Sequence, residues 1–288
     1  MADFQRLTGA LDGNAALQRR AALASLSFTM LADGEATTVA VGAQVLTNPD
    51  DPLAAAMLAA SGWSQGDGSA ENPNGWCDQG IPLYDPCCGS GTIAIEAAQI
   101  ASRMAPGLMR RFGFEKLLPF APREWQDLLT QARAQQCAPR AKVFGSDVAF
   151  RMVDFAERNA ERAGVASAIE FRGGDALQRM PPSEQAGVML VNPPYGERIE
   201  TAGVAGASGS RESAQTEDGG DFFSQLATHW KKNYAGWTAW MLTPDLKLPS
   251  RMRFKESRRV PMWNGPIECR MFRFDLRAGS MRDKSAPK

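Results

Sequence analysis

The sequence predicts an α/β protein with a seven-stranded, mostly parallel sheet whose last two strands form an antiparallel hairpin. Short apolar segments alternate with helical patterns from residue 81 to residue 191, which is typical of a parallel sheet with helices on both faces. A glycine-rich turn follows the first of these segments, at residues 89–91. Near the end of the chain, Asn264-Gly265-Pro266 forms a turn between two apolar segments, which favours a hairpin.

Each predicted element is a short apolar run or a run with apolar residues at helical spacing. The strands are expected at 81–84, 142–145, 169–172, 188–191, 237–242, 255–260 and 269–276. Helices are expected at 52–61, 92–104, 123–136, 151–163 and 222–232. Glycines at 62 and 164 would end the first and the fourth of these helices. These elements form one domain over residues 51–277.

The segments outside this pattern are harder to read. Within residues 1–50, a helix is predicted at 14–30 and a strand at 37–41. Residues 64–80 are rich in Gly, Ser, Asn and Asp, so we predict an exposed loop. Residues 201–220 are predicted to be a mobile surface insertion, and residues 278–288 a frayed tail.

Composition narrows the class of protein. A chain of 288 residues with 44% hydrophobic content can bury one large core. The net charge of zero argues against attraction of nucleic acid by the whole protein, but not against a local basic face. The five cysteines form no Cys-x-x-Cys pair and the chain has one histidine, so we expect reduced thiols and no metal. No apolar run approaches the roughly 20 residues that cross a bilayer, so we expect a cytoplasmic protein without a membrane partner.

The glycine-rich turn is the first candidate binding site. A strand that ends in a glycine loop and opens a helix brings backbone N–H groups close to a ligand. The spacing is not that of dinucleotide-binding loops, and there is no Walker lysine. A tight turn without a ligand is the alternative interpretation. The candidate ligand contacts in this segment are Asp85, Cys87, Gly89, Ser90 and Gly91.

Acidic residues recur at successive strand ends. Asp85, Asp147 and Asp175 each lie at or just after a predicted strand. Carboxylates at these positions could accept hydrogen bonds from the ribose hydroxyls and the adenine amine of a nucleoside-containing cofactor. Helix capping or turn formation is the alternative for each one alone.

The segment Asn192-Pro193-Pro194-Tyr195 follows the apolar strand at 188–191. The two prolines stiffen the backbone and hold Asn192 extended. The Asn192 side-chain oxygen and a neighbouring carbonyl could then accept both hydrogens of an exocyclic base amine. Tyr195 offers a flat face on which a base can stack. A rigid loop with a packing tyrosine is the alternative.

Basic residues gather near the C-terminus. Between residues 247 and 273 there are eight basic and two acidic residues, an excess of six positive charges. Such a surface suits contacts with RNA phosphates, although a solvated charged hairpin is the alternative. The predicted RNA contacts are Lys247, Arg251, Arg253, Arg258 and Arg259. For His229 we expect an ordinary packing or surface role.

Taken together, the motifs at 85–91 and 192–195 resemble amino-methyltransferases that use S-adenosylmethionine. Three longer segments, at 85–98, 192–199 and 264–270, resemble the bacterial large-subunit (23S) rRNA (guanine-N2)-methyltransferases of the RlmL type. These enzymes are a branch of the THUMP-associated RNA methylases, the UPF0020 family. The resemblance covers residues from about 52 to 276.

This resemblance implies a Rossmann-like class I methyltransferase fold over 51–277, with S-adenosylmethionine as cofactor and ribosomal RNA as substrate and partner. It implies methyl transfer to guanine N2, with Asn192 and the Pro193 carbonyl holding the amine, Pro194 stiffening the loop and Tyr195 stacking the base. Asn192 would also border the cofactor.

Three alternatives remain open: an adenine-N6 methylase, a protein-glutamine methylase, and a non-catalytic RNA-binding remnant. The family normally carries a THUMP module before this domain. Residues 1–50 are too few to contain one, so we expect a truncated or divergent N-terminal segment.

Overall fold

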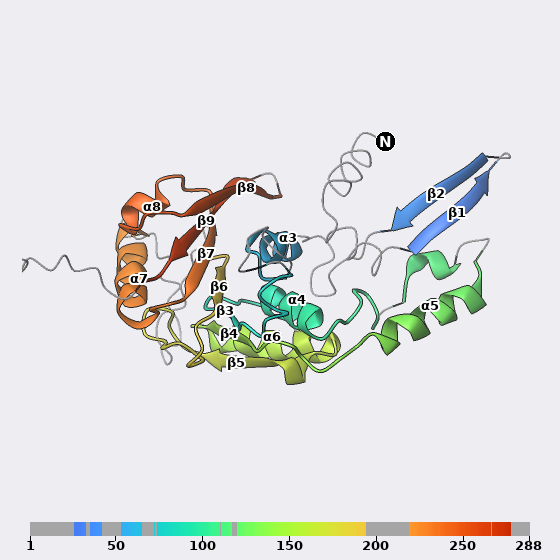
Figure 1. Cartoon of the computed structure of the whole chain (residues 1–288), viewed down its shortest axis with the longest axis horizontal. Coiled ribbons are helices and arrows are strands. Elements are labelled where there is room, and N and C mark those ends of the chain that lie inside the picture. The colour runs from blue at the N-terminus through green and yellow to red at the C-terminus, as the bar shows by residue number, and fades with distance from the viewer. Residues whose placement is uncertain are drawn as a thin grey trace, which may run out of the picture.

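A computed structural model describes residues 26–32, 35–41, 53–64, 72, 74–109, 111–116, 120–193, 219–265 and 267–277. Its centre is a seven-stranded sheet with the order β5-β4-β3-β6-β7-β9-β8 (Figure 1). The predicted seven-stranded, mostly parallel sheet with a C-terminal antiparallel hairpin is therefore confirmed. The strands are β3 (Leu83–Asp85), β4 (Val143–Asp147), β5 (Ile169–Gly173), β6 (Val188–Val191), β7 (Thr238–Thr243), β8 (Arg258–Asn264) and β9 (Ile267–Asp275).

Helices cover both faces of this sheet, as the strand–helix alternation predicts. One apolar cluster joins the strands to α3 (Leu53–Ala60), α4 (Thr92–Ala101) and α6 (Phe150–Arg162). A second cluster, on the other face, joins them to α7 (Gly219–Asn233) and α8 (Leu248–Arg251). α4 is buried on nearly every side because its sequence is apolar almost all round.

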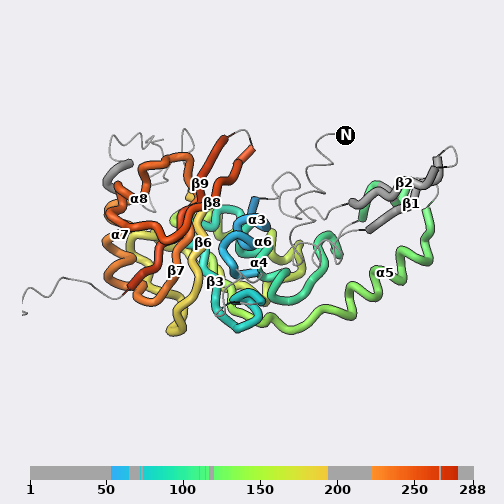
Figure 2. Tube along the Cα trace, turned by 45° about the horizontal axis from the view of Figure 1, so that its top comes forward, coloured from blue at the N-terminus to red at the C-terminus, as the bar shows by residue number. Residues whose placement is uncertain are grey.

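One helix stands apart from these layers. α5 (Pro122–Ala134) buries only Trp125, which meets the Phe112 ring edge-on. It lies in an arm that extends from the sheet, and the tube in Figure 2 shows this arm reaching well beyond α4 and α6. Two short 3-10 helices complete the domain, η1 (Gly113–Lys116) and η2 (Ala166–Ala168).

The helix predicted at 14–30 is wrong at its C-terminal end. Residues 26–30 belong to β1 (Leu26–Ala32), which pairs antiparallel with β2 (Glu35–Val41), and residues 14–25 lie outside the described residues. The strand predicted at 37–41 is confirmed within β2. The register pairs Ala32 with Glu35, so two residues connect the strands. The sequence there is Asp33-Gly34, a dipeptide typical of two-residue hairpins, which the helical spacing of leucines obscured.

Other predictions also differ from the structure. The segment predicted as an exposed loop at 64–80 contains buried residues, because Asn72 donates to the Gly62 carbonyl (2.7 Å) and Cys77 packs with the core. The insertion predicted at 201–220 ends sooner, since α7 begins at Gly219; its mobility lies outside the described residues. The strand predicted at 255–260 instead runs from Arg258 to Asn264, because its alternating apolar residues continue to Met262.

The strand order places a ligand crevice at one position. The chain moves from β3 to β4 and β5 on one side, then returns to β6 on the other side of β3. β3 pairs in parallel with both β4 and β6. Open parallel sheets bind ligands at the carboxyl ends of the strands, where the order reverses. The segments after β3 and after β6 flank that point.

Candidate active site

The loop after β3 is held by backbone hydrogen bonds from both sides. The Cys88 N–H donates to the Ser146 carbonyl of β4 (2.9 Å), and the Gly91 N–H donates to the Cys88 carbonyl (2.8 Å). On the outer side, Asn159 of α6 donates its side-chain amide to the Ser90 carbonyl (2.8 Å). The loop is therefore fixed in shape by the protein itself.

Asp85, at the end of β3, lies inside this loop. Its side chain is 1% exposed, and its Oδ1 accepts the Cys87 N–H (3.1 Å). Burial raises the pKa of this carboxyl to about 8. The hydrogen bond from the Cys87 N–H acts in the opposite direction and lowers the pKa, and the charge of Asp147 adds a smaller increase. A protonated, enclosed carboxyl positions the loop. Its predicted direct contact with a cofactor stays a prediction.

The Cys87 thiol is a partly buried group of the same loop. Burial, reinforced by the charges of Asp85, Asp147 and Asp175, raises the pKa of this thiol above its usual range. The thiol therefore stays neutral and is a poor nucleophile. Cys87 is suited to bordering a ligand rather than to reacting with one.

Asp147, at the end of β4, connects two neighbouring loops. Its Oδ2 accepts the Gly89 N–H (3.0 Å) and its Oδ1 accepts the Ala149 N–H (2.9 Å). A carboxylate has about four lone-pair positions, so two hydrogen bonds leave room for two more. The half-buried Asp147 can thus fix the glycine loop and still accept hydroxyl hydrogens from a ribose.

Asp175 follows β5 at the same edge. Its Oδ1 accepts the Leu177 N–H (2.8 Å), and the preceding Gly174 donates to the Asp147 carbonyl (2.9 Å). Asp175 Oδ2 has no hydrogen bond within the described residues. Asp147 and Asp175 therefore follow neighbouring strands at the same edge of the sheet, and each carboxylate also forms a local turn.

The two loop glycines face different surroundings. A Cβ on Gly89 would meet no atom within 4 Å, so this residue borders open space. A Cβ on Gly91 would lie 2.9 Å from the Ala156 Cβ and 3.2 Å from the Phe171 ring. Both have positive φ angles, 52° and 87°, which disfavour other residues. Gly91 packs the loop against α6, whereas Gly89 leaves room for a ligand.

Two apolar residues at this edge were missed by sequence reasoning. Val148 and Phe150 are 46% and 68% exposed, although both are large and apolar. They follow Asp147 directly, and the Phe150 ring lies over Gly173 at the end of β5. An exposed apolar pair beside an acceptor suits the flat face of a base. The signal was present as Asp147-Val148-Ala149-Phe150, a strand end followed by apolar residues where polar ones are usual.

Asn192 follows β6, on the other side of the switch point. Its Oδ1 is buried and has no hydrogen-bond partner among the described residues. The next residue, Pro193, is also buried. An unsatisfied buried acceptor costs about 1–3 kcal/mol of stability. In a native protein such an atom therefore indicates a hydrogen-bond donor on a bound ligand. Pro194 and Tyr195 lie outside the described residues.

The five predicted RNA contacts are all exposed, but they do not form one surface. Arg251 is paired with Asp245 (2.7 Å) and lies over the Phe223 ring. Arg258 and Arg259 are neighbours on β8, and side chains alternate along a strand. They therefore point to opposite faces of the sheet, with Arg258 beside its partner Arg273.

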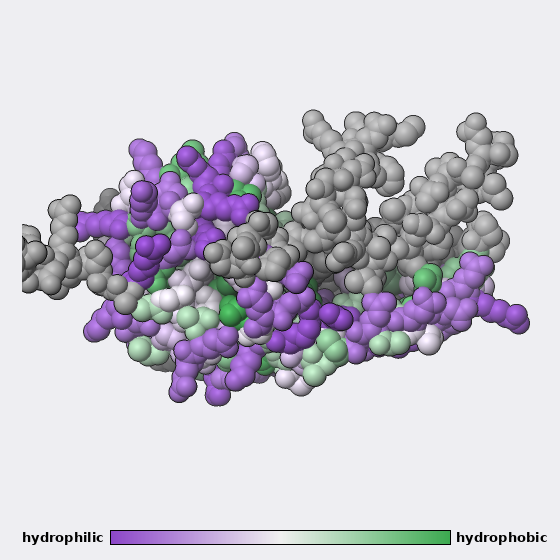
Figure 3. Space-filling view, in the orientation of Figure 1, coloured by the Kyte–Doolittle hydropathy of each residue, from purple (hydrophilic) through white to green (hydrophobic). Residues whose placement is uncertain are grey.

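The visible face of the molecule over α7, α8 and the hairpin is predominantly hydrophilic, as Figure 3 shows. His229 has the packing role expected of it. Its Nε2 contacts the Arg179 carbonyl (2.7 Å) and its Nδ1 accepts from Asn233 (2.9 Å).

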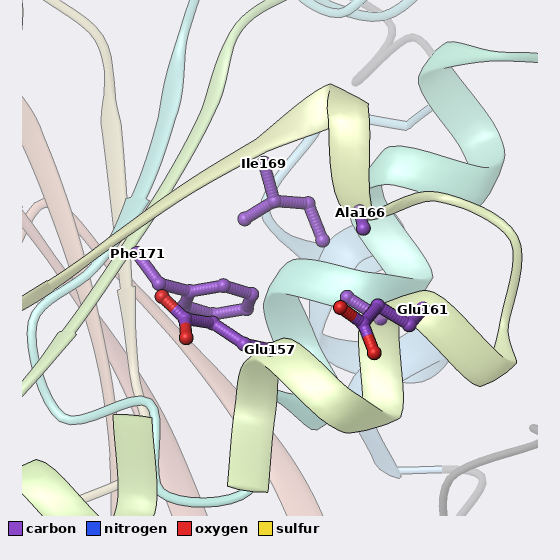
Figure 4. Close-up of a pocket in the computed structure, with 6 residues that line it drawn as sticks. Glu157, Glu161, Ala166, Ile169 and Phe171 are labelled. Carbon is purple, nitrogen blue, oxygen red and sulfur yellow. The ribbon is translucent and has the colours of Figure 1, made fainter. Parts of the chain in front are cut away.

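The described part of the chain also holds hollows outside these loops, one of them lined by Leu177 and by Ser224, His229 and Lys232 of α7. A hollow of about 240 Å³ is lined by Glu157 and Glu161 of α6 and by Ile169 and Phe171 of β5 (Figure 4). Ile169 is the first residue of β5, so the hollow lies toward the amino end of that strand. The loops described above lie at the carboxyl ends of the strands. No group of three metal-ligating side chains occurs among the described residues. None of the described helices is long and apolar enough to cross a membrane.

Comparison with known proteins identifies relatives of this chain. The "Ribosomal RNA large subunit methyltransferase K/L" of Shewanella baltica (strain OS185) is 38% identical over 237 residues, which cover 80% of this chain and 29% of that protein. The chain thus spans less than a third of the length of the curated relatives that it matches.

Solved structures share the fold. A structure described as a possible methylase from Clostridium difficile 630 is 31% identical, with a TM-score of 0.58, over 69% of this chain and 49% of that one. SMU.472, solved in complex with SAH, is 24% identical with a TM-score of 0.59, over 69% and 49%. The fold is that of class I methyltransferases, as predicted. A family model described as "RMKL-like, methyltransferase domain" (UPF0020) matches residues 50–273, and the chain belongs to this family.

Proposed function

We propose that this chain transfers the methyl group of S-adenosylmethionine to the exocyclic N2 of a guanine in large-subunit ribosomal RNA. The observation that carries the proposal is the buried, unsatisfied Oδ1 of Asn192 beside a glycine loop that the protein holds in place. Family membership and the name of the Shewanella relative support it. We take residues 51–277 as the catalytic domain and the cytoplasm as its location.

The residues after β3, β4 and β5 fit S-adenosylmethionine. Gly89 borders open space, where the methionine part would lie against backbone. Asp147 has free lone pairs for the ribose hydroxyls, and Asp175 has a free Oδ2 for the adenine amine. Val148 and Phe150 offer apolar faces for the adenine ring. When bound, the cofactor supplies an electrophilic methyl group.

The residues after β6 suit an amine that is a poor nucleophile. The lone pair of guanine N2 is delocalised into the ring. Asn192 Oδ1 and the Pro193 carbonyl can accept its two hydrogens and turn the nitrogen toward the cofactor half of the crevice. Tyr195 would stack the flipped base. The proton leaves to water after transfer, so the proposal needs no strong general base.

Methyl transfer from deuterated S-adenosylmethionine, followed by mass spectrometry of the modified molecule, tests the proposal. Large-subunit rRNA, small-subunit rRNA, DNA and a protein release factor serve as parallel substrates. We expect labelled N2-methylguanosine in large-subunit rRNA. Labelled N6-methyladenine or methylglutamine would establish a different use of the same site, and absence of cofactor binding would establish a non-catalytic remnant.

A further inference from the structure

The edge strand β8 has one face in the core and one in solvent. Val260 and Met262 pack against the cluster that includes α3 and α4. Because side chains alternate along a strand, Arg259, Pro261 and Trp263 point the other way, and all three are exposed. Trp263 is 59% exposed. Tryptophan buries a large area when it finds a partner, so the exposed ring is available for contact with another molecule.

Trp263 lies at the same edge of the sheet as Asn192. β7 ends at Thr243, which pairs with Arg270, while β8 and β9 continue their pairing to Asn264 and Ile267. The hairpin thus extends past the carboxyl end of β7. β6 and β8 are separated by two strands, which at about 4.8 Å per step puts them about 14 Å apart. A few nucleotides of single-stranded RNA span that distance.

The surroundings of Trp263 favour RNA over an apolar partner. Arg259 lies on the same face of β8 and forms no salt bridge within the described residues, nor does Lys247 after β7. Arg270 forms a salt bridge with Glu268 (2.8 Å). Glu268 is the cross-strand neighbour of Trp263. An exposed aromatic ring on a strand face that also carries an unpaired cation suits single-stranded nucleic acid, whose bases stack and whose phosphates are charged.

We propose that Trp263 is a stacking platform for an unpaired base that flanks the target guanine. The inference rests on the proposed function and adds a substrate contact to it. Stacking is tolerant of base identity, so Trp263 would position the strand while Asn192 selects the amine.

The test compares Trp263→Ala and Trp263→Phe with a matched control, Leu128→Ala. Leu128 is also a large exposed apolar residue, 45% exposed, but it lies on α5. We measure KM for a large-subunit rRNA transcript, kcat, cofactor Kd and Tm. We expect the KM of Trp263→Ala to rise roughly five- to hundredfold, the range found for stacked bases. The phenylalanine variant should stay within about threefold of wild type, with cofactor Kd and Tm unchanged in both.

A second measurement identifies the occupant. A photoreactive p-benzoylphenylalanine at position 263 should crosslink to the transcript near the methylated guanine. If the wild type is active, an unchanged KM in Trp263→Ala would overturn the inference. Crosslinking to protein alone, or a large drop in the Tm of Trp263→Ala, would also overturn it. A wild type that methylates no rRNA would instead overturn the proposed function.

Discussion

The loop after β3 and the segment after β6 follow neighbouring parallel strands but differ in how their polar atoms are satisfied. Around the first and at the ends of β4 and β5, Asp85, Asp147 and Asp175 each accept backbone N–H groups before any ligand arrives. In the second, Asn192 Oδ1 is buried without a partner in the described residues. Under the proposed function, the cofactor side is thus preorganised, whereas the substrate side reserves an acceptor. The difference predicts that binding and chemistry can be separated by mutation.

The largest effect should come from Asn192→Ala. We expect turnover on rRNA to fall about a hundredfold or more, by analogy with the loss of a positioned polar group. Its Tm should not fall, because the change removes an unsatisfied acceptor. The matched control is Asn72→Ala, which removes a buried amide that donates to Gly62. That variant should lose about 1–3 kcal/mol of stability and keep its kcat at a temperature where it is folded. A destabilised Asn192→Ala would argue against a reserved acceptor.

A pair of glycine variants should separate packing from ligand space. In Gly91→Ala, the new Cβ meets Ala156 and Phe171 at a positive φ, and we expect a loss of roughly 2–4 kcal/mol. In Gly89→Ala the φ angle is also positive, but the new Cβ meets open space. This variant should therefore lose less stability than Gly91→Ala and more cofactor affinity. Chemical denaturation and calorimetric titration distinguish the two. Equal losses of stability would contradict the different roles assigned to these glycines.

The pH dependence of unfolding should report the buried carboxyl. The pKa of Asp85 rises from 3.8 to about 8 on folding because the group is buried. The folded state therefore holds this proton more tightly than the unfolded state. The stability that the protonated Asp85 carboxyl contributes is full below pH 3.8 and is lost as the pH rises through about 8. Asp85→Asn, which keeps an acceptor for Cys87, should flatten this decline. Parallel curves for wild type and variant between pH 5 and 9 would count against a buried, protonated Asp85.

The smallest effect should come from the two arginines of β8. Arg259 shares a face with Trp263, and Arg258 points to the other face. Arg259→Ala should reduce the slope of log K against log salt by about one, as expected for a phosphate contact. Arg258→Ala should leave that slope nearly unchanged, and neither should alter cofactor affinity. Equal slopes for the two variants would mean that RNA contacts both faces of the edge strand.

The sequence predicted most of the fold because its strands are short apolar runs with clear ends. It predicted Asp147, Asp175 and Asn192 at one edge because parallel strands share a carboxyl edge. It did not reveal that Asp85 is enclosed, since burial of a strand-end acid depends on how the loop folds over it. It also treated Arg258 and Arg259 as one surface, because a count of charges ignores the alternation along a strand. It missed Trp263 because exposure cannot be read from residue type. Val148 and Phe150 did leave a signal, as apolar residues directly after a strand end.

We propose that the glycine loop with Asp147 binds the cofactor and that Asn192 acts in methyl transfer. The most direct test measures cofactor Kd and single-turnover methyl transfer in parallel for two variants. Asn192→Ala should keep the wild-type Kd and lose at least about a hundredfold in rate at saturating cofactor. Asp147→Ala removes the acceptor of the Gly89 and Ala149 N–H groups. It should weaken cofactor binding roughly ten- to hundredfold, the equivalent of about 1–3 kcal/mol, and keep most of its rate once saturated. If both variants lose affinity and rate in the same proportion, the two loops do not act separately and this account is wrong.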